Sequence, residues 1–337
     1  MSELRFLVIG CGSIGKRHIR NLLALGHTAV TAFDTAPDRR AEAEALGVAT
    51  ATDLDAHFRA ASGDHTYAAL VTTPTRLHVP VALRAAEAGH HLFIEKPVCD
   101  VGGPELARLE ARVAERDLVS LVGCNLRFHP GLCTAKALLS ERAIGRVASI
   151  RAEFGQYLPD WHPWEDYRKG YSARKDLGGG VVLDAIHELD YVRWLMGDVT
   201  EVAALAGHQS HIEIDTEDTA SILMRFASGA FGEVHLDYVQ RTYTRSCHII
   251  GDEGTIAWDF GAKGDVRVFT AATKAWETRP GPAGWEANTM YVDELRHFVA
   301  CLRREATPEQ DVAEARRVLD VALAVKRSAD ERVFVSL

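Results

Sequence analysis

The stretch LRFLVIGCGSIGKRHIRNLLALG, residues 4–26, joins a short apolar run, a glycine-rich turn and a helical repeat of apolar residues. Residues 4–9 have the length and apolarity of a buried strand. After the turn, Ile19, Leu22 and Leu23 recur at helical spacing, and glycine at the end of this run is a typical helix stop. Strand, turn and helix in this order predict the first unit of a doubly wound parallel sheet.

The turn carries the GxGxxG pattern that binds the pyrophosphate of a dinucleotide. Gly10 allows a tight turn, Gly12 lets the phosphates approach the backbone, and Gly15 lets the helix and the strand pack closely. Ser13 and Ile14 open the helix, whose free N–H groups and positive dipole end favour a phosphate. The alternative is an ordinary glycine-containing turn, and the flanking strand, helix and downstream acid argue against it.

A second expected strand, residues 27–34, ends on Asp34. A carboxylate at this position accepts hydrogen bonds from the ribose hydroxyls of NAD and repels the 2′-phosphate of NADP. Arg39 and Arg40 lie just downstream and offset part of that repulsion. The sequence therefore favours NAD over NADP.

The alternation of strands and helices continues to residue 125, which predicts an N-terminal domain over residues 1–124. Loops at the carboxyl ends of parallel strands face the ligand in such sheets. The further residues that we predict beside the cofactor at this edge are Thr72, Thr73, Pro74, His78, Glu95, Lys96 and Asn125.

Lys96 stands between the apolar run 92–94 and Pro97. A lysine at a strand end is usually a solvated surface charge. At the ligand edge it would instead donate a hydrogen bond to a substrate hydroxyl, and burial or nearby positive charge would lower its pKa toward values useful in catalysis. The residue alone is compatible with both interpretations.

From residue 147 onward the pattern changes to the alternation of half-buried strands. Residues 219–239 and 245–260 each predict a hairpin, so this part is expected to form an antiparallel sheet. Two helices, over residues 289–304 and 309–328, close the chain. The second domain is predicted to cover residues 125–337.

A long aromatic and charged segment, residues 157–180, precedes the second domain's first expected helix. Trp161 and Tyr171 are flat surfaces on which a sugar can stack, and Arg168 can contact an anion such as a phosphate or a sugar carboxylate. The alternative is a loop that packs its aromatic residues onto the sheet or against another subunit. The segment itself favours neither.

The stretch GGGVVLDAIHELD, residues 178–190, predicts one amphipathic helix from Gly180 onward. Asp184 and His187 share its polar face, which either meets water or lines a ligand site. In the second case His187 is the base, Asp184 orients its ring, and the glycines let backbone approach the ligand. HELDY lacks the second histidine of HExxH, so no metal site is predicted.

The motifs GCGSIGKRH, TTPTRLH, EKP, NLRFHP and GGG…D..H, in this order, resemble those of the glucose–fructose oxidoreductase, inositol dehydrogenase and MocA (Gfo/Idh/MocA) family almost from end to end. The resemblance implies an N-terminal Rossmann domain and a C-terminal α/β domain with a large, mostly antiparallel open sheet. It also implies NAD(P)-dependent hydride transfer at a hydroxyl or ketone carbon of a sugar, sugar nucleotide or cyclitol. The open sheet would form a homodimer or homotetramer.

Several residue roles come from this resemblance. Lys96 matches the substrate-facing lysine of the family, followed by a cis Pro97, and His187 matches its catalytic histidine. Arg127, in NLRFHP, is predicted to contact substrate together with Lys96, Trp161, Arg168, Tyr171, Asp184 and His187. The family usually spaces its Asp and His four residues apart, whereas Asp184 and His187 are three apart. An NAD-dependent glycosidase and a non-catalytic NAD-binding regulator are the alternatives.

Charge and composition exclude some classes of partner. The net charge of −9 disfavours nucleic acids and anionic membranes. Six scattered cysteines without a CxxC pair favour a reduced, cytoplasmic setting over a disulfide scaffold. The first residues are interpreted as a strand and not as a signal peptide, and no apolar run approaches the ~18 residues of a membrane span. The expected partner is a small-molecule substrate.

Overall fold

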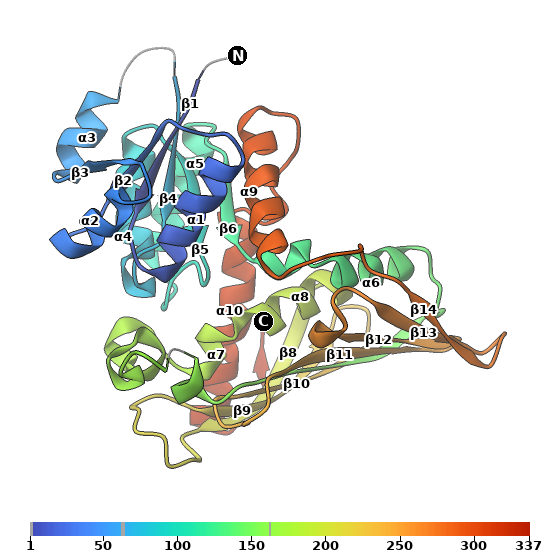
Figure 1. The fold of residues 1–337 in the computed structure, drawn as a ribbon. Helices are drawn as coiled ribbons and strands as arrows, with labels where there is room; N and C mark the ends of the chain where they lie inside the picture. Colours follow the sequence, from blue (N-terminus) through green and yellow to red (C-terminus); the bar gives the residue numbers. More distant parts are fainter. Residues whose placement is uncertain (1–2, 62–64, 162) are drawn as a thin grey trace. The chain divides into compact units, whose positions relative to one another are not determined.

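The computed structural model describes residues 3–61, 65–161 and 163–337. The chain divides into two compact units, shown together in Figure 1. Unit 1 comprises Met1–Asn125 and Asn288–Arg316, and unit 2 comprises Leu126–Ala287 and Arg317–Leu337.

Within the described residues, unit 1 is built on a six-stranded sheet in the order β3-β2-β1-β4-β5-β6. Every pair of neighbours is parallel. The strands are β1 (Leu4–Ile9), β2 (Val30–Phe33), β3 (Ala49–Ala51), β4 (Thr66–Val71), β5 (His91–Glu95) and β6 (Ser120–Gly123). The order reverses between β1 and β4, which is the point where doubly wound sheets bind dinucleotides. The predicted Rossmann architecture is confirmed.

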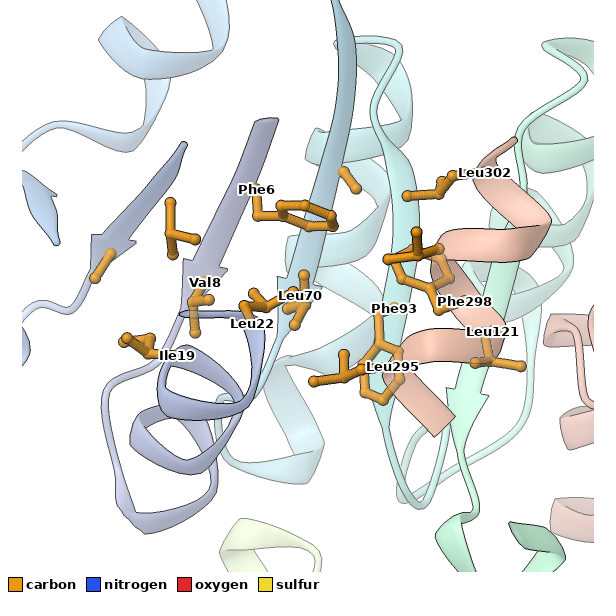
Figure 2. Packing of buried hydrophobic residues seen from close by; sticks show 14 of the residues in the cluster. Phe6, Val8, Ile19, Leu22, Leu70, Phe93, Leu121, Leu295, Phe298 and Leu302 are labelled. Atoms are coloured by element: carbon orange, nitrogen blue, oxygen red, sulfur yellow. The ribbon is translucent and has the colours of Figure 1, made fainter. Parts of the chain in front are cut away.

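The helices of unit 1 that lie between β1 and β6 connect successive parallel strands, and α9 joins them from later in the chain. They are α1 (Ser13–Ala24), α2 (Pro37–Glu44), α3 (Leu54–Ala60), α4 (His78–Glu87), α5 (Pro104–Glu115) and α9 (Asn288–Leu302). The apolar positions of α1 that set its helical period, Ile19 and Leu22, are completely buried. They pack into one cluster with Val8 and Leu70 of the sheet (Figure 2).

Helix α9 belongs to unit 1, although the sequence analysis placed it in the second domain. Its Leu295 and Phe298 are fully buried in the same cluster, beside Phe93 of β5 (Figure 2). The rings of Phe93 and Phe298 meet edge to face with centroids 5.6 Å apart. Because burying a phenylalanine side chain contributes about 1.5–3 kcal/mol, such contacts hold α9 to unit 1. Periodicity shows that α9 has an apolar face and does not show which surface covers it.

Unit 2 is built, in the described residues, on a nine-stranded sheet in the order β14-β13-β12-β11-β7-β10-β9-β8-β15. Its strands are β7 (Val147–Gly155), β8 (Val199–Gly207), β9 (Thr219–Phe226), β10 (Phe231–Asp237), β11 (Thr244–Gly251), β12 (Gly254–Asp259), β13 (Val266–Thr270), β14 (Ala275–Arg279) and β15 (Val335–Ser336). Only β7 and β10 pair in parallel, so the predicted mostly antiparallel sheet is confirmed. The predicted hairpins are β9–β10 and β11–β12.

Four helices accompany this sheet in the described chain: α6 (Pro130–Ser140), α7 (Val181–Asp184), α8 (Ile186–Met196) and α10 (Val312–Glu331), of which α10 begins in unit 1. Alternation along β9 buries Ala220, Ile222, Met224 and Phe226 on one face. The opposite face carries exposed residues such as Leu223. No described helix combines the length and apolarity that crossing a membrane requires.

Candidate active site

The glycine turn of unit 1 owes its shape to contacts within the chain. Gly10 has φ +103°, and a Cβ atom there would lie 2.6 Å from the carbonyl oxygen of Thr72. A Cβ atom on Gly15 would lie 1.9 Å from the carbonyl oxygen of Gly10. At Gly12 the nearest atom is Nη1 of Arg39, 3.9 Å away. Gly10 and Gly15 are therefore required for packing, and Gly12 leaves space beside the turn.

Helix α1 starts at Ser13 with Gly12 as its N-cap, and no described side chain caps it. The carbonyl oxygen of Gly12 accepts the first helical hydrogen bond, from Lys16 N at 3.0 Å. An uncapped helix start next to a glycine turn leaves backbone N–H groups for an anion. This geometry fits the pyrophosphate of a dinucleotide, with Ser13 and Ile14 supplying the N–H groups.

Asp34 follows β2 directly and is fixed beside the turn. Its Oδ2 accepts a hydrogen bond from Cys11 N at 2.7 Å, and its Oδ1 accepts one from Ala36 N at 2.9 Å. Each oxygen keeps a second lone pair for a ribose hydroxyl. Arg40 donates to the backbone oxygens of Asp34 and Thr35, so its guanidinium is also held at this place. The carboxylate is thus held beside the glycine turn, and both of its oxygens can accept a further hydrogen bond.

Two residues predicted to contact the cofactor have internal partners instead. The hydroxyl of Thr72 lies 2.6 Å from the carbonyl oxygen of Gly10 and fixes the turn. The ring of His78 is 1% exposed, and both of its nitrogens lie 2.8 Å from backbone carbonyl oxygens. Both residues lie between the end of β4 and the start of α4, as the spacing along the sequence predicts, but spacing does not show which way a side chain turns.

The segment Glu95–Pro97 ends β5 at the same edge of the sheet. The peptide bond between Lys96 and Pro97 is cis, as the family resemblance predicted. Burial opposes ionisation of Glu95, but the hydrogen bond to His18 and the charges of His18 and Lys96 outweigh it and lower the pKa of this carboxyl. Lys96 itself is half-buried. Lys96 is thus less exposed than a fully solvated surface charge, and its role in contacting substrate stays a prediction.

In unit 2, the predicted single helix after Gly180 is two helices. Helices α7 and α8 are separated at Ala185, whose ψ of 31° interrupts the helical path. The polar face is also not in water: His187 is 8% exposed, Asp184 is 5% exposed, and Glu188 is fully buried. Amphipathic periodicity correctly predicts which residues form the apolar face. It does not predict that the polar face is buried as well.

The carboxylate of Asp184 is surrounded by hydroxyl groups. Its Oδ2 accepts hydrogen bonds from Ser172 Oγ at 2.6 Å and from Tyr238 OH at 3.1 Å, and its Oδ1 accepts one from Tyr171 OH. Burial and the charge of Asp184 raise the pKa of Tyr238 well above its ordinary value. Tyr171, predicted to contact substrate, is thus a partner of Asp184. These hydroxyls fix the carboxylate one turn before His187.

Two acids of the HELD sequence, which the sequence analysis did not single out, form buried ion pairs. Glu188 Oε1 lies 2.8 Å from Arg245 Nε, and Asp190 Oδ1 lies 2.7 Å from Arg127 Nη2. Arg127 was predicted to contact substrate, and its guanidinium is instead bound to Asp190 with its side chain 2% exposed. The partners of these acids, Arg127 and Arg245, lie far away in the sequence. No local sequence pattern therefore indicates the two ion pairs.

The glycines before α7 make room for the chain and not for a ligand. A Cβ atom on Gly179 would lie 2.1 Å from the carbonyl oxygen of Tyr171, and one on Gly180 would lie 2.4 Å from Oε1 of Glu217. The N–H groups of Gly180 and Val181 donate to backbone carbonyls. The prediction that these glycines let a ligand approach the backbone is therefore wrong.

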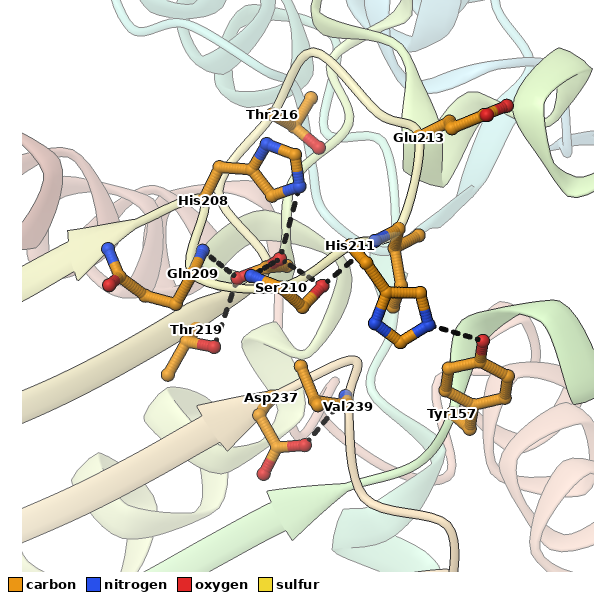
Figure 3. A network of polar contacts seen from close by, with 12 residues as sticks. Tyr157, His208, Gln209, Ser210, His211, Glu213, Thr216, Thr219, Asp237 and Val239 are labelled. Carbon is orange, nitrogen blue, oxygen red and sulfur yellow. Dashed lines mark hydrogen bonds and ion pairs between the residues drawn. The ribbon is translucent and has the colours of Figure 1, made fainter.

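The loop that carries Glu217 is ordered by the next residue, Asp218. Its carboxylate accepts hydrogen bonds from the backbone N–H groups of Gln209 and Ser210 and from the hydroxyl of Thr219, and these three partners are labelled in Figure 3. Burial opposes ionisation, and these hydrogen bonds outweigh it and lower the pKa of Asp218. Glu217, in turn, pairs with Lys326 of α10 at 2.9 Å. Buried polar contacts thus fix the backbone around the start of α7.

Within the aromatic segment, Trp161 packs onto unit 2, whereas Trp164 is 76% exposed. The ring of Trp161 meets those of Phe154 and Tyr238 edge to face, at 6.0 and 5.4 Å. Arg168 pairs with Asp166 and Glu213, each at 2.8 Å, so its charge is already compensated. In the described residues, no group of three or more histidine, cysteine or acidic side chains could hold a metal ion.

The glycine turn, the uncapped helix start and the acid after β2 together define a dinucleotide-binding protein of the Rossmann class. A family model described as "Oxidoreductase family, NAD-binding Rossmann fold" matches residues 4–123. A second, described as "GFO/IDH/MocA C-terminal domain", matches residues 132–257. The chain belongs to the Gfo/Idh/MocA family of oxidoreductases, and its cofactor is NAD.

Several characterised proteins are similar to this chain. Levoglucosan dehydrogenase of Pseudarthrobacter phenanthrenivorans is 29% identical over 61% of this chain and 58% of its own length. Myo-inositol 2-dehydrogenase of Thermotoga maritima is 27% identical over 99% of this chain and 98% of its own. The NAD(+)-dependent scyllo-inositol 2-dehydrogenase of Bacillus subtilis is 25% identical over 97% and 94%.

Solved structures agree in fold. A levoglucosan dehydrogenase in complex with NADH superposes with a TM-score of 0.88 at 24% identity, over 99% of this chain and 98% of that chain. GenD2 from gentamicin A biosynthesis, in complex with NAD, gives a TM-score of 0.84 at 25% identity over 100% and 97%. The fold is thus shared across both units.

Proposed function

We propose that the protein is an NAD-dependent dehydrogenase that oxidises a secondary hydroxyl of a cyclic polyol or sugar, or reduces the corresponding ketone. The observation that carries this proposal is the half-buried Lys96 at the strand end next to β4, in the unit whose turn fits NAD. Relatives named as levoglucosan and inositol dehydrogenases support a ring-shaped, polyhydroxylated substrate.

Two side chains, Lys96 and His187, take part in the proposed reaction. NAD, when bound, supplies the acceptor for the hydride. Lys96 donates a hydrogen bond to the substrate oxygen and stabilises its developing negative charge, while His187 accepts the hydroxyl proton. Asp184, held by its three hydroxyl donors, is a fixed negative charge close to His187 in the sequence and favours the protonated ring. Ketone reduction reverses these steps.

The direct test follows the absorbance of reduced nicotinamide with a panel of substrates. The panel contains levoglucosan, myo-inositol, scyllo-inositol, common aldoses and a sugar nucleotide. We expect net reduction of NAD with at least one neutral cyclic polyol, because Arg168 and Arg174 of the 157–180 segment are already paired with acids. NAD binding without any turnover on the panel would support the regulator instead.

A second candidate is a reaction in which the cofactor changes oxidation state only transiently. One relative, 26% identical over 68% of this chain and 60% of its own length, is named 2,7-anhydro-N-acetylneuraminate hydratase. An enzyme of this kind, like an NAD-dependent glycosidase, would convert its substrate without net accumulation of NADH. Product analysis by mass spectrometry on the same panel separates it from a dehydrogenase.

Asp34 is expected to set the preference for NAD. In Asp34→Ser the affinity for NAD should fall about 10- to 100-fold, because hydrogen bonds to a charged group contribute about 1.5–3 kcal/mol. Affinity for NADP should change less, since the repulsion of the 2′-phosphate is removed. Titration of both cofactors by nicotinamide fluorescence measures the ratio, with Asp38→Ser, on the neighbouring α2, as a control. An unchanged ratio would contradict this role.

We also propose that the open face of the unit 2 sheet joins two or four copies of the chain. This face holds a hollow of about 780 Å³ lined by Leu205, Leu223 and Phe334, which are 76%, 55% and 68% exposed. Arg151 and Glu233, which also line it, give the face both signs of charge, as contact between identical surfaces requires. Exposed apolar patches of this kind mark interaction sites.

Replacing Leu223 with Asp is expected to produce monomers, because a charge would be buried without a partner. Light scattering coupled to size-exclusion chromatography measures the mass. Val101→Asp, at a 60% exposed site in unit 1, is the matched control and should keep the wild-type mass. A monomeric wild-type protein would refute the proposed assembly.

A further inference from the structure

Two buried histidines of unit 1 contact the first and the last residue of the segment Glu95–Pro97. His18 lies on α1 and is 0% exposed, and His78 is the first residue of α4 and is 1% exposed. Neither ring is accessible to solvent to any useful extent. Their contacts therefore act on the chain itself, on the segment that carries Lys96.

His78 connects the loops that follow two neighbouring strands. Its Nδ1 lies 2.8 Å from the carbonyl oxygen of Pro97, after β5, and its Nε2 lies 2.8 Å from the carbonyl oxygen of Thr73, after β4. Carbonyl oxygens only accept, so each contact is a hydrogen bond when the facing nitrogen carries a proton. Burial outweighs the two carbonyls and the charge of Glu95 and lowers the pKa of the ring, and a neutral ring donates to one of the two carbonyls at a time.

His18 fixes the other end of the segment through the side chain of Glu95. Its Nε2 lies 2.7 Å from Glu95 Oε1, and the second oxygen of Glu95 accepts a hydrogen bond from Lys96 N at 3.2 Å. The imidazole is held by Phe93, whose ring centroid is 4.9 Å away. The carboxylate also lies against Gly123, where a Cβ atom would approach it to 3.3 Å.

We propose that His78 and His18 are positioning residues that fix Lys96 relative to the loop after β4, where the nicotinamide end of the cofactor is expected. This inference rests on the proposed function, in which Lys96 contacts the substrate. A lysine side chain has many rotamers, so its ammonium is placed accurately only if its backbone is fixed. A misplacement of about 1 Å in such a group lowers the rate up to about 100-fold.

Conservative variants of His78 separate its two contacts. The amide nitrogen of glutamine replaces Nε2, so His78→Gln keeps a donor for Thr73 and loses the contact with Pro97. Asparagine replaces Nδ1, so His78→Asn keeps the contact with Pro97 and loses that with Thr73. We expect kcat to fall about 10- to 100-fold in His78→Gln with the Kd for NAD nearly unchanged. In His78→Asn the Kd for NAD should weaken and kcat should fall less.

The same logic applies to His18. His18→Gln keeps a donor for Glu95 and should retain most of kcat, whereas His18→Leu removes it and should lower kcat as His78→Gln does. His90 provides the matched control, since it is also 1% exposed in unit 1 and packs between Phe58 and Tyr67. His90→Gln should leave kcat and the Kd for NAD unchanged. An equal loss of kcat in His90→Gln would show general loosening of unit 1 and would overturn the proposal.

A second measurement does not depend on the substrate. Reductive ¹³C-methylation of the folded protein labels its lysines, and the signal missing in Lys96→Arg identifies Lys96 in the NMR spectrum. The signal should shift or broaden in His78→Gln and His18→Leu and stay in place in His90→Gln. Unchanged signals in the first two variants would refute the positioning role. If the wild-type protein turns over no substrate, the proposed function fails, and the Lys96 signal still decides this inference.

Discussion

Lys96→Ala is expected to bind NAD with nearly wild-type affinity and to oxidise substrate at least about 100-fold more slowly. Donors that stabilise a developing negative charge are worth about 10²–10³ in kcat, and general acid–base groups about 10²–10⁴. The binding of NAD should persist because the turn at Gly10–Gly15 and the carboxylate of Asp34 are fixed by contacts that do not involve the Lys96 side chain. Single-turnover formation of NADH measures the chemical step, and nicotinamide fluorescence measures binding.

In unit 2, His187→Ala is also expected to leave NAD binding nearly unchanged and to lower kcat about 10²–10⁴-fold. The loss of kcat should be smallest at high pH, where hydroxide replaces the base. His211→Ala serves as a control, because this histidine lies on a loop beside Tyr157 (Figure 3) and has no assigned role. Lys96→Arg tests whether charge alone suffices at the lysine. Full activity in both Lys96→Ala and His187→Ala would refute the assignment of these residues.

The order of strands and helices in unit 1 was predictable because each local signal had one physical meaning. An apolar run, GxGxxG and an acid after the next strand admit a single arrangement on a parallel sheet. The positions of Gly10, Gly15 and Asp34 followed from this arrangement, and their contacts agree with it. What could not be predicted was the covering of α9, since an apolar face at Leu295 and Phe298 fits any apolar partner.

Helices α7 and α8 of unit 2 show what local sequence patterns cannot predict. Periodicity predicted an apolar face, with Asp184 and His187 on the opposite, polar face. It had no means to show that Arg245, more than fifty residues away, would neutralise Glu188 in the interior. Burial of a polar helix face is decided by partners distant in sequence. The role predicted for His187 rests on the resemblance to a family and not on periodicity.

The same reasoning changes the role of Arg127. The sequence placed it near substrate through its motif, whereas the structure gives it Asp190 as a bidentate partner, with Nε 3.1 Å from Oδ2 and Nη2 2.7 Å from Oδ1. The guanidinium also lies 5.9 Å from the centre of the Trp194 ring. A charge satisfied in this way holds α8 to the segment before α6.

Breaking this pair is therefore expected to destabilise unit 2 strongly. In Asp190→Ala the free energy of unfolding should fall by about 3–5 kcal/mol, because Arg127 would be left as an uncompensated buried charge. All six tryptophans lie in unit 2, so intrinsic fluorescence during urea denaturation reports on this unit separately from unit 1. Asp252→Ala, which breaks the exposed pair with Arg146 in the same unit, is the control and should change the transition little.

The double variant Arg127→Met/Asp190→Leu distinguishes a structural arginine from one that binds substrate. Replacing both partners of a buried ion pair with apolar residues of similar volume is often neutral, so most of the lost stability should return. If Arg127 is structural, the KM for the substrate should return with it. A double variant that regains its stability and still has a strongly raised KM would place the guanidinium of Arg127 in contact with the substrate after all.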